Sequence, residues 1–149
     1  MESKRATQLF FERYTGAISC FDKASSLNSR YLESLHNKGC ALQRLDEFEA
    51  AIDCFDKAES IRAGLFETLN NKALSLIALG DCTGALTCVD RCISMGLVKS
   101  SFYVVRSTCF LALDQIGEGL FDLTISLKLD PQSKHALALL EVFNRAATA

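Results

Sequence analysis

The chain has 149 residues, 49% of them hydrophobic, which is enough to bury a continuous core in one domain. Sixteen basic and eighteen acidic residues leave a net charge of -2, so neither nucleic acid nor an anionic membrane is expected as a partner. Residues 1–7 lack the apolar run of a signal peptide, and no apolar segment is long enough to span a membrane, which favours a cytoplasmic protein.

The sequence predicts an all-α chain, because one proline and eight glycines leave little material for tight β-turns. In chain order, the predicted helix pairs are about 2–11 with 14–28, 32–45 with 48–61, 66–79 with 82–95, and 100–113 with 116–128. A single helix is predicted at about 133–146.

These helix pairs follow an internal repeat. The segment Ala17–Ala24 recurs as Ala51–Ala58 and, more loosely, as Ala85–Cys92, so its start moves from position 17 to 51 and then to 85, an offset of 34 each time. A second segment, His36–Leu42, returns as Asn70–Leu76 at the same offset. Because two independent segments share one period, we divide the chain into repeats at about 1–31, 32–65, 66–99 and 100–133.

Large and small side chains hold fixed places in each repeat, and small residues let two antiparallel helices approach closely. In repeat 32–65 these places are held by Leu35, Gly39, Leu42, Ala51, Phe55 and Ala58. Period and pattern together resemble the tetratricopeptide repeat, a helix-turn-helix unit, over nearly the whole chain. The resemblance implies one domain over residues 1–149, a right-handed α-solenoid of antiparallel helix pairs with a C-terminal capping helix.

The two ends of the chain depart from the repeat. The first helix of repeat 1–31 is cut short. The last predicted helix is similar to the first helix of a further repeat through Leu137 and Leu140, but Glu141 takes the place of a small residue and Asn144 that of a large one. Both polar residues suit a cap, because that face of the helix meets water when no partner helix follows it.

The resemblance implies that a protein or peptide lies along the concave face formed by the first helices. The residues expected to contact it are His36, Asn37, Asn70, Asn71, Leu74, Ile77, Val104 and Leu111. An asparagine amide can pair with both the N–H and the C=O of a bound chain, and exposed apolar residues can anchor a helix or an apolar peptide. Replacing Leu74 and Leu111 with glutamate is therefore expected to abolish binding without unfolding the chain. The alternative is that the C-terminal helix, or residues outside this sequence, cover the apolar part of this groove.

Some members of the family hold acidic chaperone tails with lysine, asparagine and arginine at five groove sites. The corresponding residues here are His36, Cys40, Asn71, Ser101 and Val105, of which Asn71 alone matches. Binding of an acidic chaperone C-terminus is therefore not expected.

Charged residues also follow the period. Lys4, Lys38, Lys72 and Arg106 recur at the same offset, as do Asp22, Asp56 and Asp90. Because cations and anions recur together, the pattern favours ion pairs within the chain over a row of phosphate-binding sites.

Enzymatic chemistry and metal binding find little support in the sequence. The seven cysteines are odd in number and contain no C-x-x-C pair, which indicates reduced thiols that pack as small hydrophobic residues. Only two histidines are present, and no nucleophile, phosphate-binding or zinc motif occurs. We therefore expect no catalysis, no cofactor and no metal.

The function that this sequence favours is that of an adaptor or scaffold whose concave groove binds a peptide or helix. Two alternatives stay open. The same surface or the shortened first repeat could drive self-association into a homo-oligomer, or the chain could be the regulatory arm of a larger protein.

Overall fold

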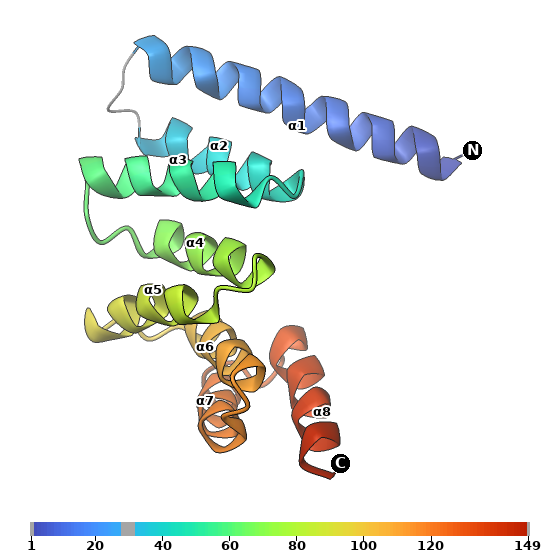
Figure 1. Ribbon diagram of the computed structural model, residues 1–149, viewed down its shortest axis with the longest axis vertical. Coiled ribbons are helices and arrows are strands. Elements are labelled where there is room, and N and C mark those ends of the chain that lie inside the picture. Colours follow the sequence, from blue (N-terminus) through green and yellow to red (C-terminus); the bar gives the residue numbers. More distant parts are fainter. Residues whose placement is uncertain (1, 28–31, 149) are drawn as a thin grey trace. The chain divides into compact units, whose positions relative to one another are not determined.

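The computed structural model describes residues 2–27 and 32–148, with the side chains of α1 described over residues 4–20. This part of the chain contains eight helices and no strand (Figure 1). They are α1 (Glu2–Leu27), α2 (Leu32–Arg44), α3 (Phe48–Ile61), α4 (Phe66–Ala78), α5 (Cys82–Ser94), α6 (Ser100–Ala112), α7 (Ile116–Leu129) and α8 (Lys134–Thr148). The all-α prediction is confirmed, and α2 to α8 lie within a few residues of their predicted bounds. The chain divides into two compact units, Met1–Ser75 and Leu76–Ala149, each described below by itself.

The turns inside the helix pairs recur at one place in the repeat. Asp46, Gly80 and Asp114, one repeat apart in the sequence, all have left-handed backbones, with φ of 60°, 84° and 59°. The residue after each of them donates its backbone N–H to a carbonyl in the last turn of the preceding helix, as in Glu47 to Leu42 at 2.9 Å. Glycine and aspartate tolerate this backbone better than most residues, so they end the first helix of each pair.

The predicted break between residues 11 and 14 is wrong, because α1 is one continuous helix of 26 residues. Glu12 stands one repeat before Asp46, where the other pairs have their left-handed residue, and glutamate is a good helix former. Arg5 stands where Gly39 lies in the next repeat, so a hairpin here would place a guanidinium at a close helix contact. The helix therefore runs on, and its N-terminal half extends past α2 and α3 (Figure 1).

In the first unit, α2 packs against α3 through the predicted pairing of a small residue with a large one. Phe55 is fully buried, and its ring lies so close to Gly39 that a β-carbon at position 39 would collide with it. Ala51 and Ala58, on the same helix as Phe55, are also fully buried. The small residue at position 39 is therefore required by packing and not by backbone conformation.

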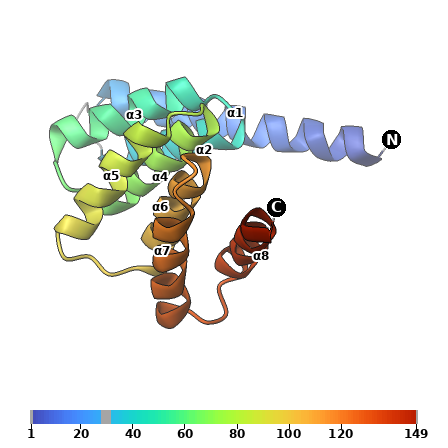
Figure 2. The same cartoon turned by 60° about the horizontal axis from the view of Figure 1, so that its bottom comes forward.

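In the second unit, α6 and α7 form the corresponding pair, and α8 packs against both (Figure 2). The Ser107 hydroxyl donates to the Gly119 carbonyl at 2.8 Å, and the ring of Phe143 from α8 lies directly against Gly119. Leu123, Ala136 and Phe143 form the buried centre of this unit.

The packing face of α8 is partly the predicted one. Glu141 and Asn144 are exposed, as expected for a capping helix. Leu140 packs against the core cluster, but Leu137 is exposed, and the buried contacts come from Ala136 and Phe143 instead. The helix therefore buries only the face that meets α6 and α7.

The repeating charges form ion pairs within the chain. Lys72 lies 2.6 Å from Asp56, and Arg106 lies 2.9 Å from Asp90, as the common period predicts. Asp22 lies outside the residues whose side chains are described. Arg106 makes a further, unpredicted pair with the buried carboxylate of Asp122, at 2.6 Å.

Candidate functional site

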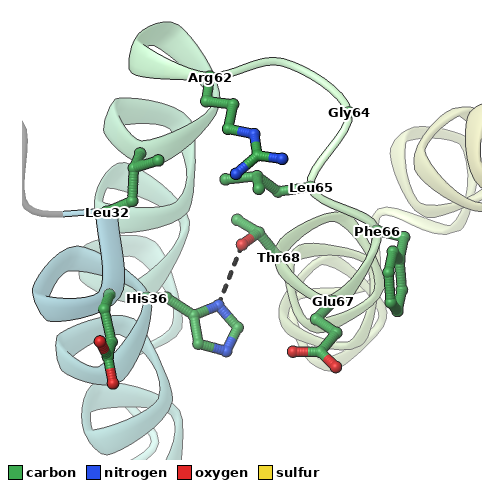
Figure 3. Close-up of a pocket in the computed structure, with 9 residues that line it drawn as sticks. Leu32, His36, Arg62, Gly64, Leu65, Phe66, Glu67 and Thr68 are labelled. Atoms are coloured by element: carbon green, nitrogen blue, oxygen red, sulfur yellow. Dashed lines mark hydrogen bonds between the residues drawn. The ribbon is translucent and has the colours of Figure 1, made fainter.

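Two hollows flank α2 in the first unit. The α2–α4 pocket has a volume of about 310 Å³ and lies between the start of α2, the loop after α3 and the start of α4 (Figure 3). It is lined by Leu32, Glu33, His36, Arg62, Gly64, Leu65, Phe66, Glu67 and Thr68. The α1–α2 pocket has a volume of about 300 Å³ and is lined by Arg13, Tyr14, Ala17, Asn37, Cys40, Ala41 and Arg44.

A fixed loop forms one wall of the α2–α4 pocket. Gly64 has a φ of 82°, a backbone that glycine adopts without strain. The Glu59 carboxylate accepts hydrogen bonds from the backbone N–H groups of Gly64 at 3.3 Å and Leu65 at 2.9 Å. These bonds hold the loop in place, and Figure 3 shows Arg62 reaching from it over the pocket toward Leu65 and Thr68.

Polar side chains connect α2 to α4 between the two pockets. His36 Nδ1 lies 3.0 Å from the Thr68 hydroxyl, the contact drawn in Figure 3, and its Nε2 lies 3.5 Å from Cys40 Sγ. The Asn71 amide donates to the same sulfur at 3.5 Å. Gln43 donates to the Asn71 carbonyl and to the Ser75 hydroxyl, both at 2.7 Å. The two helices therefore present one preorganised polar surface.

This network brings a cysteine and a histidine together, which sequence reasoning did not anticipate. Burial raises the pKa of the Cys40 thiol; the charge of Arg44 opposes this shift and that of Glu67 adds to it. A thiol with a raised pKa stays protonated at neutral pH, whereas nucleophilic cysteines need the thiolate. Cys40 therefore acts here as a hydrogen-bonding partner of His36 and Asn71. Within the described side chains, no group of three or more His, Cys, Asp and Glu residues is placed to hold a metal ion.

The predicted contact residues of the first unit lie on α2 and α4, and their surroundings differ. His36 lines the α2–α4 pocket and Asn37 the α1–α2 pocket, whereas Asn71 is engaged with Cys40. Asn70 carries a buried amide oxygen without a hydrogen-bond partner among the described residues. Leu74 is 44% exposed and is therefore accessible to a ligand.

The predicted contact residues of the second unit are less accessible to a ligand than those of the first unit. Ile77 is half-buried, and Val104 and Leu111 pack against the cluster of Leu123, Ala136 and Phe143. The capping helix α8 therefore covers these two, which is the alternative that the sequence left open. Because Leu111→Glu would press a carboxylate against this cluster, we now expect this substitution to destabilise the second unit.

Sequence reasoning missed the residues that complete the two pockets. It considered only first-helix positions, while Arg62 and Gly64 come from the loop after α3, and Arg13 and Tyr14 from α1. The glycine between two helical segments was the available signal for the loop.

Comparison with known proteins identifies one of the repeats. A sequence model of the tetratricopeptide repeat matches residues 32–64, which include α2, α3 and most of the loop after α3. Residues 32–64 are therefore a tetratricopeptide repeat. The match falls inside the repeat 32–65 that the internal period defines, so the resemblance drawn from the sequence is confirmed. No curated protein sequence matches the chain.

Solved structures of similar fold support this assignment. MamA from Desulfovibrio magneticus is 18% identical with a TM-score of 0.83, and the match covers 97% of this chain and 83% of MamA. The first such domain of human RPAP3 is 20% identical with a TM-score of 0.74, over 78% of this chain and 92% of that one. The first domain of Spaghetti (RPAP3), bound to the HSP90 peptide SRMEEVD, is also 20% identical, with a TM-score of 0.74, over 82% and 97%. At these identities, the likeness establishes an all-α tetratricopeptide fold.

No helix within residues 2–27 and 32–148 is both long and apolar enough to cross a membrane.

Proposed function

We propose that this chain is an adaptor that binds a peptide along the face formed by α2 and α4 in its first unit. The observation that carries the proposal is the pair of pockets on either side of α2, because first-helix residues at places where the family contacts ligands line both of them. Glu33, Arg44, Glu67 and Leu74 on this face are exposed. A similar structure, that of Spaghetti (RPAP3), holds a peptide, which supports a peptide as the class of ligand.

The chemistry of this face sets limits on the peptide. Glu33 and Glu67 line the α2–α4 pocket beside the apolar Leu32 and Leu65. Against the single guanidinium of Arg62, these two carboxylates leave the pocket lining with a net negative charge, which disfavours an acidic segment and favours a basic or apolar side chain. The proposed ligand therefore differs at this pocket from the acidic HSP90 peptide held by Spaghetti (RPAP3).

Selection from a random peptide library against the whole chain tests this function. Peptides selected on the wild type should bind Leu74→Glu about tenfold more weakly or worse, since burying a leucine contributes about 1.5–3 kcal/mol and about 1.4 kcal/mol corresponds to tenfold. Leu129→Glu is the matched control, because Leu129 is as exposed as Leu74, at 44%, but lies at the end of α7. Fluorescence anisotropy measures the affinities. Equal binding by both variants would place the contact elsewhere.

Self-association is the second candidate, and α1 supplies the observation that favours it. Every residue from 4 to 13 is exposed, including Leu9, at 64%, and its neighbours Phe10 and Phe11. Exposed apolar clusters of this kind are typical of interaction surfaces. If α1 drives self-association, the mass measured by sedimentation will rise with concentration for the wild type and stay that of one chain for Leu9→Glu combined with Phe11→Glu. A wild type of constant single-chain mass rules this candidate out.

A further inference from the structure

Two arginines of the first unit are not held by ion pairs with the described residues. Lys72 is held by Asp56, and the Arg106 guanidinium in the second unit bonds two aspartates. Arg13 and Arg44, in contrast, form no ion pair and no side-chain hydrogen bond with the described residues, and both are exposed. They come from different helices and line the same hollow, the α1–α2 pocket.

The other described residues of this pocket add hydrogen-bond donors. No carboxylate is among the seven described residues that line it. Tyr14 and Asn37, both half-buried, bring a phenolic O–H and an amide N–H₂ group, and Ala17 and Ala41 leave the space open. In a chain whose net charge is -2, this is a local site of positive charge. The guanidinium groups of Arg13 and Arg44 therefore lie at one hollow without an anionic partner among the described residues.

We infer that the α1–α2 pocket binds a phosphorylated side chain of the peptide ligand, an inference that rests on the proposed function. Guanidinium groups bind phosphate oxygens through paired N–H donors, and a phosphate carries close to two negative charges at neutral pH, which two arginines balance. A carboxylate carries half of that charge and one oxygen fewer. The C-terminal dipole of α2 opposes an anion near Arg44, but its effect is smaller than that of two charge-assisted contacts.

Inorganic phosphate is the first probe, because it tests the pocket without any peptide. In ¹⁵N-labelled full-length chain, phosphate should shift the Nε–H signals of Arg13 and Arg44 and the side-chain amide of Asn37 in a saturable way, compared with chloride at equal ionic strength. Arg44→Gln should weaken this binding about tenfold, while Arg145→Gln, at an exposed site on α8, should leave it unchanged. Equal, non-saturating shifts at all exposed arginines would overturn the inference.

Matched peptides form the second arm of the test. A library-selected peptide is made in three versions that carry serine, phosphoserine or glutamate at one position, scanned along its length. At one position, phosphoserine should bind about tenfold more tightly than both others, and the double variant Arg13→Gln with Arg44→Gln should remove the gain. An equal gain from glutamate, or a gain that survives in the double variant, would overturn the inference and leave the proposed function intact. A pocket that binds phosphate in a chain that selects no peptide would refute the proposed function instead. Circular dichroism confirms that the variants are folded.

Discussion

Replacing Arg106 with methionine is expected to lower the free energy of unfolding by about 3–5 kcal/mol, because it leaves a buried carboxylate without a counter-charge. Asp122 is 1% exposed and accepts two hydrogen bonds from Arg106, at 2.6 Å from Nε and 2.8 Å from Nη2. The same guanidinium donates to Asp90 at 2.9 Å. The hydrogen bond with Asp122 is also the main cause that raises the pKa of Arg106 above its usual value.

Urea denaturation of three variants tests this prediction. Lys72→Met breaks an ion pair whose aspartate, Asp56, is about half exposed, so its cost should stay below about 1 kcal/mol. Arg106→Met combined with Asp122→Leu should recover most of the loss, because the buried charge is removed together with its partner. A cost of Arg106→Met no larger than that of Lys72→Met would contradict the role given to the buried pair.

Replacing Phe143 with alanine should destabilise the chain by about 3–5 kcal/mol, the usual cost of removing a buried phenylalanine. Phe143 is fully buried, packs against Gly119, and belongs to the cluster of Leu123 and Ala136 that holds α8 in place. Loss of the Phe143 ring also removes part of the cluster against which Val104 and Leu111 pack.

The neighbouring residue provides the control for this prediction. Val142 is exposed, so Val142→Ala should change the unfolding free energy by only about 0.5 kcal/mol. Thermal or urea denaturation compares the two, and binding of a fluorescent apolar dye reports exposure of the α6 surface. Equal stability of both variants would mean that α8 is not held as described.

The sequence predicts the repeated part of the fold well because that part is fixed by local geometry. The spacing of small and large residues predicts the close contact of Gly39 with Phe55, and the left-handed residues that the structure adds, Asp46, Gly80 and Asp114, recur at the same period. At the ends the repeat stops determining the structure. Glu12 lacks the turn signal that Asp46 provides, so α1 continues, and α8 buries Phe143, a residue to which the repeat pattern gives no special place.

The binding role of the candidate site stays a prediction. Two of its residues, His36 and Asn37, line hollows in the first unit. Repeat positions do not reveal that Leu111 is partly buried, because this burial depends on how α8 packs against α6. The second wall of each pocket also escapes the pattern, since Arg62 lies in a loop and Arg13 in the part of α1 that departs from the repeat. The repeat pattern cannot predict contacts between segments that do not share its period, so these contacts are known only from the three-dimensional structure.

Backbone amide shifts of the full-length chain, measured while a library-selected peptide is added, test the peptide-binding face most directly. We expect the largest changes to lie on α2 and α4, around Glu33, His36, Asn37 and Glu67, and to saturate with the affinity found by anisotropy. Changes centred instead on α7, around the exposed Phe121, would contradict the assignment of this face.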